Sequence, residues 1–137
     1  MERFELTAIG VVESLLTDLS GAPKQGDEGA PEAWLAFDPE FAGALDGLAP
    51  GDQLVVLTWF HLADRDVLSV HPRGDASRPP RGVFGTRSPH RPNPVGLHRV
   101  ELLEVDGTRL RVSDMEAVDG TPIVDVKPVL SADASER

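Results

Sequence analysis

Apolar residues follow a strand-like spacing through most of this chain. Residues 4–14 (FELTAIGVVES) alternate apolar and polar positions, and residues 53–60 (QLVVLTWF) form a nearly continuous apolar run. The first pattern predicts a half-buried strand and the second a buried central strand. Shorter strands are expected at residues 34–37 and 67–70, where brief apolar runs stand between polar segments.

Turn residues divide the rest of the chain. Asp106-Gly107 separates two further strand patterns, at 97–105 and 108–113, and this dipeptide is a strong hairpin signal. A second Asp-Gly, at 119–120, precedes a strand pattern at 121–126. Short strands with frequent turns predict a mainly all-β fold, a compact β-barrel over residues 1–130 followed by a loose tail at 131–137.

One short helix is expected within this barrel. Asp38 is a suitable N-cap, Pro39 suits the first helical position, and Gly47 is a plausible stop. Two long loops are also expected. Residues 15–31 are polar with glycine and proline, and residues 71–94 hold six of the chain's 12 prolines. Proline removes backbone donors, so the second segment must be irregular but stiff, interrupted by a short strand at 82–85.

Several classes of protein are disfavoured. The chain has no cysteine, which excludes disulfides and thiolate chemistry. It has no apolar run long enough to cross a bilayer and no signal-peptide pattern at its N-terminus, so a cytoplasmic protein is expected. No G-x-G-x-x-G follows a strand, which argues against a Rossmann fold. The spacings of His61, Asp64, His71 and His90 match no compact ligand pattern, so no metal site is predicted.

The charge is distributed unevenly. The 137 residues carry a net charge of −10, yet residues 65–99 contain seven arginines and only two aspartates, a net +5. The rest of the chain therefore carries −15. This basic segment has two interpretations at this stage: it meets an anionic partner, or it is a surface loop paired with acidic neighbours.

Two segments carry residues suited to chemistry. In residues 81–97 (RGVFGTRSPHRPNPVGL), glycines permit close backbone approach, prolines pre-form the loop, and Arg87 and Arg91 offer planar forks for carboxylate or phosphate. In residues 119–128 (DGTPIVDVKP), a tight turn leads into a strand on which Asp125 and Lys127 share one face. A charged strand face more often only meets water.

These strings, in this order, resemble the TrmO family, also described as the TsaA-like domain. The resemblance is carried by residues 10–14 (GVVES), 22–26 (APKQG), 59–65 (WFHLADR), 82–97 and 119–128, and it spans residues 9–130. It implies a compact barrel that binds S-adenosylmethionine and forms a homodimer. It also implies methylation of the N6 nitrogen of N6-threonylcarbamoyladenosine, next to the anticodon of tRNA.

Site roles follow as hypotheses from the resemblance and the residue types. Candidates for a general base or a charge-stabilising donor are Asp125, Asp119 and His61. Expected cofactor contacts are Phe84, Gly85, Thr86, Arg87, Ser88, Gly120, Thr121 and Pro122. Expected substrate contacts are Arg91, Asn93, Lys24, Gln25 and Lys127.

Two other functions stay open. A methyltransferase acting on a small metabolite would have a closed pocket and no affinity for RNA. A sensor module would bind S-adenosylmethionine without transferring the methyl group.

Overall fold

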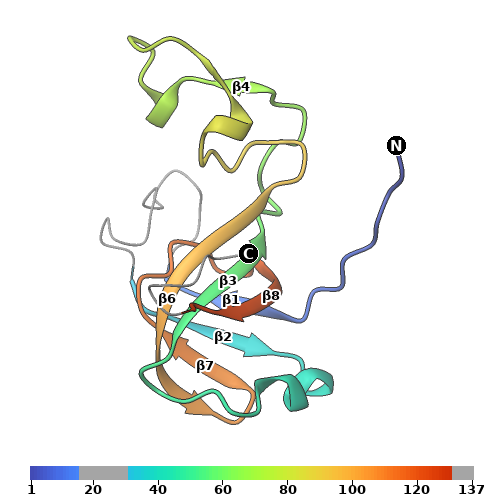
Figure 1. Ribbon diagram of the computed structural model, residues 1–137, viewed down its shortest axis with the longest axis vertical. Coiled ribbons are helices and arrows are strands. Elements are labelled where there is room, and N and C mark those ends of the chain that lie inside the picture. The colour runs from blue at the N-terminus through green and yellow to red at the C-terminus, as the bar shows by residue number, and fades with distance from the viewer. Residues whose placement is uncertain (16–30, 131–137) are drawn as a thin grey trace.

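The computed structural model describes residues 1–15 and 31–130 as a closed antiparallel barrel with a lobe at one end (Figure 1). The strand order around the barrel is β1-β2-β7-β6-β3-β8. The bounds are β1 Gly10–Glu13, β2 Ala33–Phe37, β3 Gln53–Trp59, β6 Val95–Asp106, β7 Arg109–Val112 and β8 Pro122–Pro128. The predicted mainly-β barrel is therefore confirmed, and the fold is not of the Rossmann type.

The barrel interior is filled by side chains that alternate along the strands. In β6, every second residue from Gly96 to Leu102 is buried, and in β2 the buried positions are Ala33, Leu35 and Phe37. This alternation follows from the two-residue period of a strand with one face toward the core. Among the described residues, the buried polar side chains are Thr58, His98 and Thr121.

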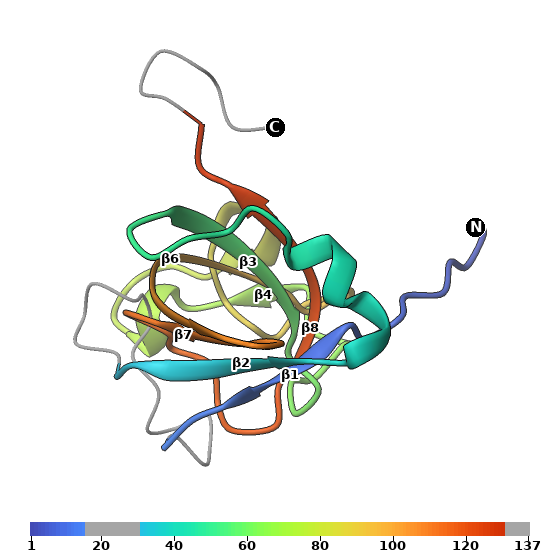
Figure 2. The ribbon, with the colours of Figure 1, turned by 90° about the horizontal axis from the view of Figure 1, so that it is seen from below.

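Both ends of the first predicted strand differ from the expectation. Pairing begins at Gly10 and ends at Glu13, whereas residues 1–8 are exposed and run away from the barrel in both views (Figures 1 and 2). The alternation at residues 4–9 was suited to a strand, but only Ile9 finds a backbone partner, donating its N–H to the Ile123 carbonyl over 2.8 Å. Strand propensity without a neighbouring strand does not produce a strand.

The predicted helix forms as a 3₁₀ helix, η2, over Pro39–Leu45. The Asp38 side chain caps it by accepting from the Glu40 N–H over 2.9 Å. Gly47, the expected stop, has a positive φ of 91°. The Asp106-Gly107 hairpin also forms, with Asp106 opposite Arg109.

The lobe consists of residues 60–94, between β3 and β6. It contains a two-stranded pair, β4 (Ser69–Val70) with β5 (Arg81–Gly82), and two short 3₁₀ helices, η3 (Pro72–Gly74) and η4 (Val83–Gly85). The strand expected at 67–70 is thus shorter, and the one expected at 82–85 is replaced by β5 and η4. In the part of the chain described, no helix has the length and apolar character needed to span a membrane.

Strand direction places the predicted site segments at one end of the barrel. Because the neighbouring strands are antiparallel, the C-terminal ends of β1, β3 and β7 lie beside the N-terminal ends of β2, β6 and β8. The lobe and the connection 113–121 leave from this end, whereas η2 lies at the opposite end (Figure 1). We call the first of these the lobe end.

Candidate functional site

The loop 83–91 of the lobe is held together by one of its own arginines. Arg91 donates from Nε to the Ser88 carbonyl over 2.9 Å and from Nη2 to the Thr86 carbonyl over 2.7 Å, and Nη2 also donates to the Val83 carbonyl. Proline and glycine leave this segment without a regular backbone ladder, so a guanidinium satisfies the carbonyls instead. Arg91 thereby orders the loop predicted to contact the cofactor.

A second arginine ties the lobe to the barrel. Arg65 donates from Nε to the Pro92 carbonyl over 2.8 Å and from Nη2 to Asn93 Oδ1 over 2.9 Å. Its guanidinium also lies 5.0 Å from the centroid of the Trp59 ring, within cation–π range. The two strand ends that lead into the lobe are therefore joined by side chains as well as by backbone pairing.

The Asp119-Gly120 turn closes against β1. Asp119 Oδ1 accepts from the Ser14 N–H over 2.9 Å, and Gly120 donates its N–H to the Val12 carbonyl over 2.7 Å. Gly120 has a φ of 83°, a conformation that glycine adopts without strain. Thr121 is buried, and its hydroxyl donates to the Val118 carbonyl over 2.7 Å. The second oxygen of Asp119 has no partner among the described residues.

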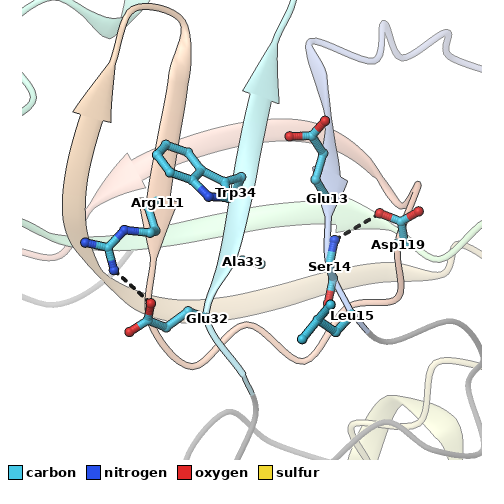
Figure 3. A pocket seen from close by; sticks show the side chains of 8 residues that line it. All are labelled: Glu13, Ser14, Leu15, Glu32, Ala33, Trp34, Arg111 and Asp119. Carbon is cyan, nitrogen blue, oxygen red and sulfur yellow. Dashed lines mark hydrogen bonds and ion pairs between the residues drawn. The ribbon is translucent and has the colours of Figure 1, made fainter.

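Beside this turn lies a hollow of about 400 Å³ (Figure 3). Its lining comes from the ends of β1 and β2, from β7 and from the turn: Glu13, Ser14, Leu15, Glu32, Ala33, Trp34, Arg111 and Asp119. Three carboxylates and one indole ring therefore stand around a space of the size that small ligands occupy. The hollow opens at the lobe end of the barrel.

Two of the three carboxylates are ion-paired. Glu13 accepts from Arg109 Nη2 over 2.6 Å, and Glu32 accepts from Arg111 Nη1 over 2.8 Å. Hydrogen bonds to Glu104 and then to Glu32 raise the pKa of Arg111 above its ordinary value. The Arg109 guanidinium lies 4.5 Å from the centroid of the Trp34 ring. These contacts fix the wall of the hollow and leave Asp119 as its carboxylate without a cationic partner.

Sequence reasoning did not identify a buried polar chain under the lobe. Thr58 Oγ1 lies 2.6 Å from His98 Nε2, and His98 Nδ1 lies 2.5 Å from Glu116 Oε1. The edge of Phe60 packs on the His98 ring, with centroids 5.6 Å apart. One signal was available. In the pattern of β6, the inward positions set by Val100 also place His98 inside, where the apolar Leu97 would be expected.

The structure brings most of the predicted site residues to the lobe end. Thr86, Ser88 and Arg91 share one network, in which Ser88 donates its N–H to Thr86 Oγ1 over 3.2 Å. Within the same lobe, the side chains of Phe84, Gly85, Arg87 and His61 are exposed. Asn93 is joined to Arg65, and the Asp119–Pro122 turn lies at the adjoining ends of β1 and β8.

Two predicted residues lie apart from this end. Asp125 and Lys127 do share one face of β8, and their side chains form an ion pair of 3.2 Å. They line a second hollow, of about 200 Å³, together with η2 residues such as Phe41 and Leu45. Lys24 and Gln25 lie outside the described residues. The segment that holds them begins after Leu15 and ends before Pro31.

Comparison with known proteins agrees with this architecture. The family described as the tRNA-methyltransferase O N-terminal domain matches residues 11–134. A "Probable S-adenosyl-L-methionine-binding protein" of Methanothermobacter thermautotrophicus is 50% identical over 126 residues, covering 92% of this chain and 90% of that protein. An "S-adenosyl-L-methionine-binding protein" of Archaeoglobus fulgidus is 43% identical over 122 residues, covering 89% of this chain and 86% of that one.

The fold is similar to that of solved structures as well. The crystal structure of TrmO from Pseudomonas aeruginosa superposes with a TM-score of 0.74 at 29% sequence identity, covering 100% of this chain. This chain spans 62% of the length of that TrmO chain. The barrel, its lobe-end segments and the family match together lead to one conclusion: the chain belongs to the TrmO N-terminal domain family, the TsaA-like domain.

Proposed function

We propose that this protein binds S-adenosylmethionine at the lobe end and methylates the N6 nitrogen of N6-threonylcarbamoyladenosine beside the anticodon of tRNA. The observation that carries the proposal is the juxtaposition of two features. A carboxylate-rim hollow with a tryptophan wall lies at the same barrel end as a lobe rich in arginine. The first suits a cationic methyl donor and the second a polyanionic acceptor.

The hollow fits the charge of the donor. S-adenosylmethionine carries a sulfonium and an ammonium against one carboxylate, so its net charge is positive. Asp119 has one carboxylate oxygen without a partner among the described residues, and Trp34 offers an aromatic face. Both features attract a desolvated cation. The bound donor supplies the methyl group, and the residues named here would bind and orient it.

The proposed donor contacts include the turn and the neighbouring loop. Gly120, Thr121 and Pro122 continue from Asp119, and Phe84, Gly85, Thr86, Arg87 and Ser88 form the loop that Arg91 holds. Phe84 is 84% exposed, which is unusual for a phenylalanine and suits a side chain that covers a ligand. Ordering this loop in advance lowers the entropy cost of binding.

The proposed acceptor contacts are cationic and polar. The guanidinium groups of Arg78, Arg81 and Arg87 form no hydrogen bond or ion pair with the described part of the chain, so they are available to phosphate or to the threonyl carboxylate. Lys24, Gln25, Arg91, Asn93 and Lys127 remain proposed substrate residues. Asp119, Asp125 and His61 remain proposed candidates for the base.

We also propose a homodimer. Val95 and Leu97 are 39% and 46% exposed on the outer face of β6, opposite Trp59 and Leu57 of β3. An apolar stripe of this kind on a sheet face suits a second copy of the chain. Light scattering should give twice the monomer mass for the wild type and the monomer mass for Leu97→Glu. A monomeric wild type would contradict the dimer.

The test of the main proposal is transfer of labelled methyl from S-adenosylmethionine to bulk tRNA. We expect label on tRNA that contains N6-threonylcarbamoyladenosine and none on tRNA that lacks it. Arg87→Ala should reduce the label at least tenfold, whereas Arg3→Ala, an exposed arginine far along the N-terminal segment, should not. Donor binding by calorimetry with no labelled tRNA would favour a small-molecule methyltransferase or a sensor.

A further inference from the structure

The buried polar chain of Thr58, His98 and Glu116 has one atom left over. His98 has a fully buried side chain and Glu116 one that is 11% exposed. If Nδ1–H of His98 is donated to Glu116 Oε1, then Nε2 accepts the Thr58 hydroxyl, and both ring nitrogens are satisfied. Glu116 Oε2 is buried and has no hydrogen-bond partner.

An unpartnered carboxylate oxygen inside a protein is costly. Burial removes its water, and the low dielectric around it gives nothing in return unless a donor arrives. Buried polar atoms without partners are rare, and they concentrate where a ligand or a proton completes them. The free oxygen of Glu116 therefore points to a hydrogen-bond donor that binds here.

Glu116 is the end of the chain that a ligand can reach. It lies in the connection 113–121, three residues before Asp119, whose side chain lines the hollow. Thr58 and His98 are instead deeper in the barrel, where Gly96 leaves room for them: a Cβ on Gly96 would stand 2.4 Å from Thr58 Oγ1. Since Oε2 itself is covered, ligand entry must displace its cover.

We propose that Glu116 is the catalytic base of the methyl transfer, with His98 and Thr58 as the positioning residues behind it. This inference rests on the proposed function. The acceptor nitrogen forms its bond to the methyl carbon while the carbon–sulfur bond breaks, and that electron pair stays on sulfur. The nitrogen's proton passes to Glu116 Oε2, and the N–H electron pair remains on nitrogen. The neutral Glu116 still accepts from His98 through Oε1.

The other carboxylates near the site are placed differently. Asp119 is exposed and uses one oxygen to accept from the Ser14 N–H, and Asp125 is ion-paired with Lys127 near the other end of the barrel. Glu116 combines burial, an oxygen without a partner and an oriented histidine. A carboxylate held in this way keeps its geometry while its charge changes, which general base catalysis requires.

The kinetic test compares Glu116→Gln with Asp119→Asn. Glu116→Gln keeps the shape and an acceptor for His98, and we expect its kcat to fall by about 100-fold or more. Its affinity for S-adenosylmethionine, measured by calorimetry, should stay within about threefold of wild type. His98→Asn should lower kcat less than Glu116→Gln and leave KM for tRNA unchanged. A large loss of kcat in Asp119→Asn with none in Glu116→Gln would overturn the proposal.

A spectroscopic test does not depend on turnover. The His98 Nδ1–H proton should shift when the protein, saturated with S-adenosylhomocysteine, binds N6-threonylcarbamoyladenosine nucleoside. It should not shift with the N6-methylated nucleoside, which lacks the hydrogen, or in Glu116→Gln. Equal shifts with both nucleosides would mean that Oε2 meets only water, and would overturn the proposal.

The two levels of hypothesis fail in different ways. If the wild type binds S-adenosylmethionine but methylates no tRNA, the proposed function fails and the base falls with it. If the wild type methylates tRNA and Glu116→Gln does so equally fast, only the base proposal fails. If Glu116→Gln weakens donor binding more than tenfold with unchanged kcat, Glu116 is a donor contact and not a base.

Discussion

Arg91 donates from Nη2 to the Thr86 carbonyl over 2.7 Å, across five residues of the same loop. The same guanidinium donates from Nε to the Ser88 carbonyl. A side chain that the sequence marks as a ligand for anions is therefore engaged with the backbone of its own loop. The shape of the loop depends on this residue, and the consequence can be measured.

Arg91→Lys should loosen the loop 83–88. A lysine ammonium cannot reproduce the planar fork, so at least one of the loop carbonyls loses its charged donor, at a cost of about 1–3 kcal/mol. We expect faster amide exchange of residues 86–88 by NMR and weaker binding of S-adenosylmethionine. The matched control is Arg87→Lys, whose guanidinium has no partner in the described residues. Unchanged exchange in Arg91→Lys would contradict this account.

Gly96→Ala should destabilise the barrel. Its Cβ would lie 2.4 Å from Thr58 Oγ1 and 2.5 Å from Phe60 Cζ, and both neighbours are held by packing. We expect a loss of about 1–3 kcal/mol in the free energy of unfolding, measured with denaturant. Gly43→Ala serves as the control, because a Cβ at that position of η2 meets nothing within 4 Å. Equal stability of the two variants would show that the lobe end adapts freely.

Asp75 should make the tip of the lobe sensitive to acid. Hydrogen bonds from the Ser77 hydroxyl and then from the Ser77 backbone N–H lower the pKa of Asp75. A lowered pKa in the folded state stabilises the turn above the unfolded value, and the stabilisation is lost as pH falls through the lowered pKa. In an NMR titration from about pH 6 to pH 2, Asp75 should titrate below an ordinary aspartate. Ser77→Ala should raise its midpoint.

The free arginines of the lobe should set the salt dependence of RNA binding. If Arg78, Arg81 and Arg87 each contact a phosphate, their replacement by alanine removes about 0.7–0.9 per contact from the slope of log K against log salt. Binding of tRNA at several salt concentrations measures this slope. The Arg3→Ala variant should keep the wild-type slope, and an unchanged slope in the triple variant would place the RNA elsewhere.

The strand pattern was informative because a local rule governs it. In β3 and β6, side chains alternate between core and surface, and the Asp106-Gly107 turn joins β6 to β7 wherever their partners lie. The length of β1 was not predictable from this rule. Residues 4–9 have a suitable pattern, yet pairing starts only where β2 and β8 are available.

The sequence by itself determined the strand pattern, the basic segment, the stiff loop and the family strings that carry the functional hypothesis. Only the tertiary structure decided which polar groups face one another. Arg65 and Arg91 turn inward to loop carbonyls, and Thr58, His98 and Glu116 meet only because the barrel closes. The physical reason is that alternation assigns a residue to a face, whereas contact between distant residues depends on register and closure.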